Sequence, residues 1–235
     1  VQIGNGGHNS SVLTTGEGWH GDISVTAGGT IDFKGGDARD NWAQLGNGGR
    51  STRSGAAGGN NFGHHGDINV SAGTGITFAA GTISPFEGAG EDGHMSAQLG
   101  HGGYDADVNA SNNFAAGLGH KGDIRVVTTT GDINFFGGDN TLNGGIGNNN
   151  GRFLFSQLGH GGYAAGGEHI GAIKVEATAG SINFTAGGAN DINNSDVYHY
   201  AQLGHTVNNQ GTGWDLSAAN AGLGGTTGLG MLSLI

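Results

Sequence analysis

The sequence predicts an all-β protein, and within that class a three-sided parallel β-helix, or β-solenoid, with long loops rich in glycine and asparagine. Three observations support this prediction. First, 54 of the 235 residues are glycine and only one is proline, as in chains that use glycine to separate short strands. Second, two motifs recur along the chain. Third, apolar residues in these motifs alternate with polar or small ones, the pattern of strands with one buried face.

The first motif reads H-x-G-D-I-x-V and is followed, after a short turn, by G-x-I-x-F. Its copies stand at 19–33, 64–78, 120–135 and 169–184. In the first copy, Ile23 and Val25 alternate with polar residues. Ile31 and Phe33 do the same after the turn. Because a period of two places alternate side chains on one face of a strand, each copy predicts two short strands.

The second motif reads A-Q-L-G-H-G-G-Y and predicts a third strand in each repeat. Full or shortened copies stand at 1–7, 43–49, 97–104, 155–163 and 201–205. One repeat cannot bury its apolar face alone, but stacked repeats place Ile on Ile and Phe on Phe. We expect one wide coil per repeat, and two narrow coils per repeat is the alternative.

The repeats divide the chain into about four units and a terminal segment. The units cover 1–47, 48–101, 102–160 and 161–205, and we expect 206–235 to form a terminal coil with a strand that either caps the solenoid or joins the next subunit. Equal motifs at unequal spacing indicate a fixed unit with variable loops. The loops lie at 35–41, 82–95, 137–152 and 187–200. Their Gly, Asn and Asp residues suit turns.

Composition argues against several classes of protein. The formal net charge of −11 argues against a nucleic-acid partner, because binding to phosphates needs a basic surface. The absence of cysteine excludes a disulfide scaffold and a thiolate metal site. No apolar run reaches the length of a membrane-spanning helix. A chain that starts within a repeat at Val1 is what we expect of a processed protein or of a piece of a longer one.

The motifs resemble the repeats of large bacterial exoproteins of the filamentous haemagglutinin and autotransporter-adhesin type. The likeness lies in G-D-I-x-V-x-A, G-x-I-x-F-x-A-G and A-Q-L-G-H-G-G-Y, and it covers nearly all of residues 1–205. It implies a protein secreted to the exterior or to the bacterial cell surface, a right-handed β-helical rod, and a role in adhesion, biofilm or surface architecture. The chain differs from the family in lacking a secretion domain and a long array, as a fragment would.

The glutamine of the second motif is predicted to be structural because it occurs in every copy. The glutamines are Gln2, Gln44, Gln98, Gln157 and Gln202. Side-chain amides both donate and accept hydrogen bonds, so stacked glutamines predict an amide ladder along the solenoid axis.

Histidines recur at two motif positions. One position holds Asn5, Asn47, His101, His160 and His205. The other holds Trp19, His64, His120 and His169. Neutral histidine is a common metal ligand, but ligands converge on one ion, whereas a ladder presents one group per coil. Since Asn and Trp replace His, we predict ladder or turn residues and no metal or catalytic site.

Acidic residues in the loops are the candidates for a calcium ion, which takes carboxylate and carbonyl oxygens. They are Asp37, Asp40, Glu87, Glu91, Asp92, Asp105 and Asp107. The alternative for them is a solvated acidic surface. The aspartates of the G-D pairs, such as Asp22 and Asp67, are predicted to cap turns instead. No other cofactor is expected.

Both ends of the chain are strand-like and show no obvious cap, although exposed β edges normally need one. The residues expected to mediate self-association are Val1, Ile3, Met231, Leu232, Leu234 and Ile235. We expect copies to associate end to end into a filament, or the same edges to continue into further repeats of a longer rod.

These observations favour a non-enzymatic, extracellular structural or adhesive β-solenoid, with loops available to contact cell-surface glycans or proteins or the matrix. The alternative is a carbohydrate-binding or carbohydrate-cleaving β-helix, because enzymes of this fold draw acid and base groups from one cluster in a groove. Loops that converge on such a groove would favour the enzyme, and loops that decorate a rod evenly would favour the structural protein.

Overall fold

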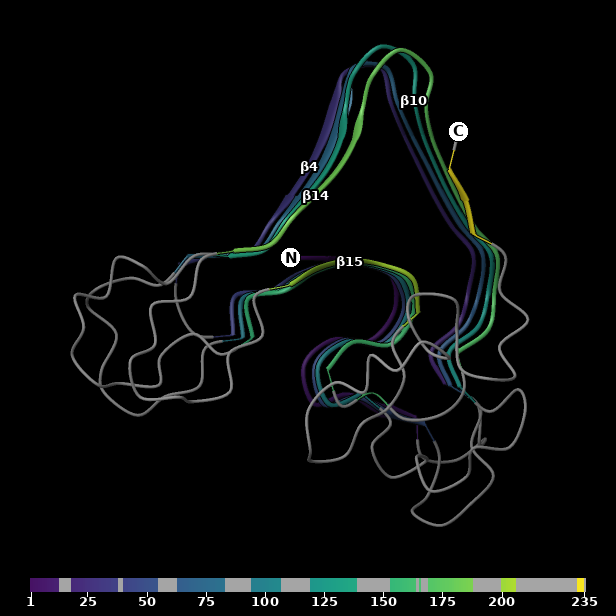
Figure 1. Ribbon diagram of the computed structural model, residues 1–235. Coiled ribbons are helices and arrows are strands. Elements are labelled where there is room, and N and C mark those ends of the chain that lie inside the picture. The colour runs from purple at the N-terminus through teal and green to yellow at the C-terminus, as the bar shows by residue number, and fades with distance from the viewer. Residues whose placement is uncertain are drawn as a thin grey trace, which may run out of the picture.

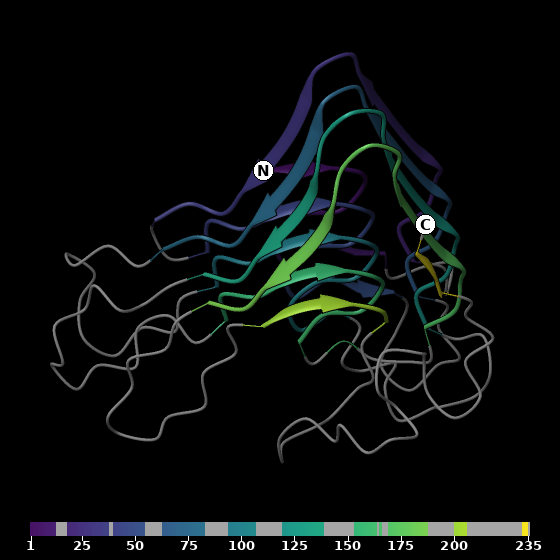
Figure 2. The same ribbon diagram turned by 45° about the horizontal axis from the view of Figure 1, so that its top comes forward.

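The computed structural model is a β-solenoid that winds through three parallel sheets. It describes residues 1–12, 18–37, 40–54, 63–82, 94–106, 119–138, 153–163, 165, 169–187, 200–205 and 232–234. Seen along the axis, the coils superimpose, and two long sides meet at an apex opposite the third side (Figure 1). The tilted view shows the same coils as a stack (Figure 2). The predicted all-β, three-sided parallel solenoid is confirmed.

Each side of the solenoid is one parallel sheet. The glutamine sheet contains β1 (Gln2–Ile3), β5 (Ala43–Leu45), β9 (Ala97–Leu99), β12 (Ser156–Leu158) and β15 (Ala201–Leu203). The valine sheet contains β3 (Ile23–Ala27), β7 (Ile68–Ala72), β10 (Ile124–Thr128), β13 (Ile173–Ala177) and β16 (Leu232–Leu234). The phenylalanine sheet contains β4 (Thr30–Lys34), β8 (Gly75–Ala79), β11 (Ile133–Phe136) and β14 (Ile182–Thr185). A short fourth pair joins β2 (Ser11–Val12) to β6 (Arg53–Ser54).

Each repeat forms one coil. Gln2 lies beside Gln44 in the glutamine sheet, so a motif residue pairs with the same residue of the next repeat. The other two sheets follow the same rule, since β3 pairs with β7 and β4 pairs with β8 in matching register. The expectation of one wide coil per repeat is confirmed, and the alternative of two narrow coils is wrong.

Identical apolar side chains stack inside the solenoid. The rings of Phe33, Phe78, Phe135 and Phe184 form a column whose successive centroids are 5.0, 5.2 and 4.9 Å apart. This spacing matches the roughly 4.8 Å between neighbouring strands, so the ring stack follows from the in-register pairing. Phe78 and Phe135 are fully buried, and full burial stabilises such a side chain by about 1.5 to 3 kcal/mol.

Glycine is required where the turns of successive coils lie on each other. Gly100 follows the strand β9 and has a φ of +150°. A Cβ atom at Gly100 would lie 2.0 Å from the carbonyl oxygen of Gly159 in the next coil. Only a residue without a side chain permits this approach, which explains why glycine follows the Q-L or Q-I pair in every copy.

The end of the chain returns to the solenoid as a fifth strand of the valine sheet. In β16, Leu232 lies beside Ile173 and Leu234 beside Val175. The strand therefore pairs within its own chain. Among the described residues, no helix is long and apolar enough to cross a membrane.

Candidate functional site

The first histidine column lines the turns that follow the glutamine sheet, and it consists of Asn5, Asn47, His101, His160 and His205. The Nδ1 atom of His101 accepts a hydrogen bond of 2.9 Å from the backbone N–H of Asn47 in the preceding coil. Its Nε2 atom lies 2.6 Å from the carbonyl oxygen of Gly66. Because Nδ1 is the acceptor, the ring proton of a neutral imidazole sits on Nε2, which donates to Gly66. The imidazole thus joins two coils and two sides of the solenoid.

Asn47 performs the same task in the second coil. The Oδ1 atom of Asn47 accepts the N–H of Asn5 at 2.9 Å. Its Nδ2 atom donates to the carbonyl oxygens of Gly21 and His65, both at 2.9 Å. The amide and the imidazole both offer one acceptor toward the preceding coil and one donor toward a neighbouring turn. This equivalence explains the exchange of Asn for His within the column and identifies its role as architectural.

The second histidine column consists of Trp19, His64, His120 and His169. The Nδ1 atom of His64 accepts the N–H of Trp19 at 2.9 Å, and the two later histidines accept the N–H of the residue before them in the column. The Nε2 atom of His64 lies 2.9 Å from the hydroxyl of Thr52. Neighbouring rings stack with centroids 4.9 Å apart. Histidine rings therefore stack along the axis at both motif positions.

The first histidine of the second column, His64, pairs with the hydroxyl of Thr52. Backbone hydrogen bonds from Ser51 to Tyr104 and from Asp105 to Tyr163 set the register. This register aligns Thr52 with Ala106 and Ala165, two buried residues. Within the described part of the chain, Nε2 of His169 has no hydrogen-bond partner. Among the described residues, the second column therefore carries a buried ring nitrogen without a hydrogen-bond partner, that of His169.

Burial keeps both columns neutral. Burial, with a smaller contribution from nearby histidines, lowers the pKa of His64 and of His169 to about 3. Burial also lowers the pKa of His101 to about 4, although its bond to Gly66 acts in the opposite direction. A neutral imidazole with both nitrogen atoms engaged has no lone pair left for a metal ion.

The five glutamines stack in one column of the glutamine sheet. Their hydrogen bonds differ from the expected ladder. Nε2 of Gln44 donates to the carbonyl oxygens of Gly100 and Gly102 at 3.1 and 2.8 Å, and Gln2 and Gln98 donate to glycine carbonyls of the next coil in the same way. Oε1 of Gln44 has no partner among the described residues. The amides therefore tie each strand to the glycine turn of the next coil, rather than to each other.

The aspartates of the G-D pairs also connect coils. Oδ1 of Asp22 accepts the N–H of Asp67 at 2.9 Å, and Asp67 accepts the N–H of Asp123 at the same distance. Asp123 in turn accepts the N–H of Ala172 at 2.9 Å. Each carboxylate satisfies a turn amide of the following coil, which is the capping chemistry that short polar side chains provide.

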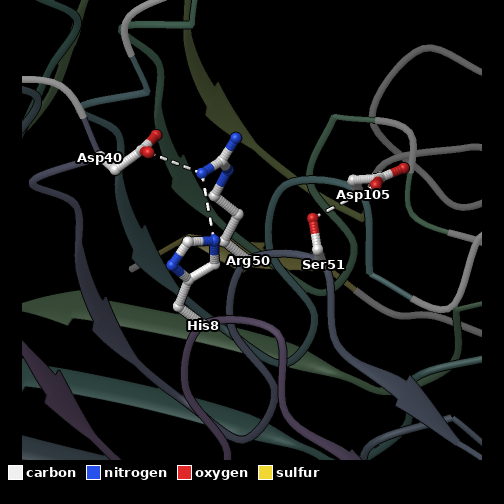
Figure 3. Close-up of polar contacts among 5 residues, drawn as sticks. All are labelled: His8, Asp40, Arg50, Ser51 and Asp105. Carbon is white, nitrogen blue, oxygen red and sulfur yellow. Dashed lines mark hydrogen bonds and ion pairs between the residues drawn. The ribbon is translucent and has the colours of Figure 1, made fainter.

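The calcium candidates are dispersed in the part of the chain that the structure describes. Asp40 forms an ion pair of 2.7 Å with Arg50, and Asp105 accepts the hydroxyl of Ser51 at 3.3 Å (Figure 3). Asp37 is exposed. The remaining four candidates, Glu87, Glu91, Asp92 and Asp107, lie outside the described residues. No group of three or more His, Asp or Glu side chains suited to a metal ion occurs in the described ranges.

A third column, the corner column, consists of His8, Arg50, Tyr104 and Tyr163. Nη1 of Arg50 lies 3.2 Å from Nε2 of His8 (Figure 3), and its guanidinium carbon lies 5.7 Å from the centroid of the Tyr104 ring. The rings of Tyr104 and Tyr163 stack at 5.4 Å. His94 and Phe153 pack against these tyrosines. Sequence reasoning missed Arg50, although it occupies the position after N-G-G where later copies carry tyrosine.

A small pocket opens beside the corner column. Its lining includes Trp42, Arg50, His94, Ser96 and Tyr104. Its cavity volume of about 10 Å³ is close to the space that one water molecule requires. The pocket is therefore too small for a sugar ring.

The residues predicted to mediate self-association lie in different environments. Val1, which precedes β1, is 82% exposed, and Ile3 in the edge strand β1 is 40% exposed. Leu232 and Leu234 belong to β16 and pair with β13. Met231 and Ile235 lie outside the described residues. The apolar edge at Val1 and Ile3 is therefore exposed, whereas the strand β16 is already paired with β13 of the same chain.

Comparison with known proteins gives no match to a protein-family model, to a curated protein or to a solved structure. Function is therefore inferred from the geometry of the chain itself.

Proposed function

We propose that this chain is a non-enzymatic structural element, a segment of an extracellular rod or filament whose loops are available to contact a cell surface or matrix. The observation that carries this proposal is the in-register stacking of equivalent residues in every coil. A catalytic site needs groups from different positions that converge on one point. In the described coils, each kind of recurring polar side chain instead occurs once per coil and is distributed along the axis.

The contacts of these side chains supply cohesion between coils. His101 joins Asn47 to the turn at Gly66. Asp67 caps the turn of the following coil. Such contacts give each coil the same interface with its neighbour, so stability accumulates along the axis as in other repeat proteins. A rod of this kind tolerates loops of different length because the loops lie outside the repeated interface.

The proposed partner is a further solenoid coil, either from another copy of the chain or from a longer parent rod. Among the described strands, β1, β3 and β4 lie at one edge of the three sheets, and β15, β16 and β14 lie at the other edge. Edge strands offer unpaired N–H and C=O groups to another strand. The likeness of the motifs to bacterial exoprotein repeats supports a location outside the cell.

Self-association can be tested by sedimentation velocity and electron microscopy of the purified chain at increasing concentration. We expect concentration-dependent elongated particles. Ile3→Lys places a charge on the open apolar edge of β1 and should reduce elongation. The matched control Asn69→Lys introduces the same charge on the exposed face of the internal strand β7 and should elongate like the wild type. Wild-type particles of one size at all concentrations, or equal effects of the two variants, would count against the proposal.

Carbohydrate binding is the second candidate, and the corner column is the observation that favours it. Tyr104 and Tyr163 are partly exposed and stacked, and aromatic rings provide an apolar body with a polar tip. Screening the chain against immobilised glycans tests this candidate. Binding that Tyr163→Ala abolishes, while Asn69→Lys leaves it intact, would support the carbohydrate function.

A further inference from the structure

Six buried imidazoles hold successive coils together through the same type of hydrogen bond. These column histidines are His64, His101, His120, His160, His169 and His205. In each of them Nδ1 accepts the backbone N–H of the equivalent residue in the preceding coil, at distances between 2.9 and 3.2 Å. The first column also binds a carbonyl oxygen through Nε2, at 2.6 Å in His101, 2.7 Å in His160 and 3.0 Å in His205.

Protonation is incompatible with this geometry. A second ring proton would sit on Nδ1 and would face the backbone N–H that now donates to it, so an acceptor would become a donor. The bond between the coils would be lost at that position. The new charges would also repel each other, because neighbouring rings stack with centroids 4.8 to 4.9 Å apart.

We propose that the column histidines make the cohesion between coils acid-labile, so that the solenoid is intact at neutral pH and comes apart in mild acid. This inference goes beyond the structural function above, and it holds for the isolated chain whether or not copies associate.

The charged groups around the columns do not stabilise the protonated form of the column histidines enough to offset burial. Burial is the largest influence, and it lowers the pKa of His101 to about 4 despite the carboxylates of Asp67 and Asp22, which act in the opposite direction. His65, which stacks on the exposed His20, lowers the pKa of His101 and of His64. Within and between the columns the histidines lower each other's pKa.

The direction of the pH effect follows from proton linkage. An unfolded chain takes up protons at these imidazoles below about pH 6.5, whereas the folded chain resists until the pH approaches the lowered values. The contribution of the histidines to stability is therefore complete above pH 6.5 and is lost as the pH falls below it. At pH 5 a histidine whose pKa in the folded chain is about 3 or 4 shifts the equilibrium toward the unfolded chain by about 30-fold. The three histidines with a pKa of about 3 or 4, namely His64, His101 and His169, together give about 3 × 10⁴-fold.

Urea unfolding at a series of pH values between 7 and 4.5 tests the proposal. The slope of the free energy of unfolding against pH gives the number of protons taken up on unfolding. We expect His101→Asn to fold, because Asn47 occupies the same column position, and to take up about one proton fewer than the wild type at pH 5. The control His8→Asn removes an exposed imidazole that belongs to neither histidine column, and its proton uptake on unfolding should equal that of the wild type. Equal proton uptake by His101→Asn and the wild type would overturn the proposal.

Nitrogen chemical shifts of the wild-type imidazoles provide a second measurement that needs no variant. Six histidines should remain neutral, with the proton on Nε2, down to the pH at which the fold is lost. Their titration near pH 6.5 within an intact fold would refute the proposed acid lability. A chain that forms filaments at neutral pH but shows no acid transition would refute this inference and leave the structural function standing.

Discussion

Replacing Thr52 by valine tests the idea that each buried imidazole needs a partner at both nitrogen atoms. Thr52 and His64 are both fully buried, and the hydroxyl lies 2.9 Å from Nε2. Because Nδ1 of His64 accepts the N–H of Trp19, Nε2 carries the proton and donates to the hydroxyl. Valine has nearly the same shape as threonine, so Thr52→Val removes the acceptor and leaves little cavity.

The expected loss follows from the cost of an unsatisfied buried donor, about 1 to 3 kcal/mol. For a chain of this size, a loss of about 2 kcal/mol lowers the melting temperature by roughly 4 to 8 °C. Urea unfolding at pH 7.5 measures the change where the histidines are neutral in both states. Thr52→Ser keeps the hydroxyl and should be more stable than Thr52→Val. A Thr52→Val variant as stable as the wild type would refute the assigned hydrogen bond.

Three further substitutions test other contacts by the same measurement. Ala165→Thr places a hydroxyl at the position equivalent to Thr52, near His169 Nε2, which has no hydrogen-bond partner among the described residues. It should raise stability by about 1 kcal/mol, whereas Ala165→Val should not. Gly100→Ala places a Cβ 2.0 Å from a carbonyl oxygen and should prevent folding or strongly lower the midpoint of urea unfolding. A Cβ at the control position Gly28 would have no atom within 4 Å, so Gly28→Ala should not lower the midpoint. Equal midpoints for the two variants would contradict the turn packing. Phe78→Ala removes an inner ring of the stack and should lower the free energy of unfolding by about 3 to 5 kcal/mol. A loss of less than about 1 kcal/mol would argue against the stack.

The strands could be predicted because the repeat is explicit in the residues. Alternation at Ile23, Val25, Ile31 and Phe33 identifies two strands per copy, and the Q-L-G motif identifies the third. A repeat also predicts strand pairing: each motif strand should pair with the same strand of the next repeat, because their identical apolar faces are buried best when the two strands are in register. For this reason the sequence alone predicts which residues stack on one another.

The hydrogen-bond partners could not be predicted in the same way. Gln44 was expected to bond to other glutamines, but it donates to glycine carbonyls of the next coil. The motifs did not indicate a role for Thr52 or Arg50. In the structure, Thr52 forms a hydrogen bond with His64, and Arg50 forms an ion pair with Asp40. Each of these contacts joins residues from different motif positions, and their approach depends on how the chain turns between the sheets.

The sequence by itself determined that this protein is a three-sided solenoid with one glutamine, two histidine positions and one phenylalanine stacked per coil, because equal side chains at equal positions in a repeat must lie above each other. Only the tertiary structure decided that the histidines are neutral acceptors of backbone N–H groups, and that Asn47 forms equivalent hydrogen bonds in their place. The direction of a ring nitrogen and the burial around it depend on the turns that close the coil, and these turns bring together residues that no periodicity relates.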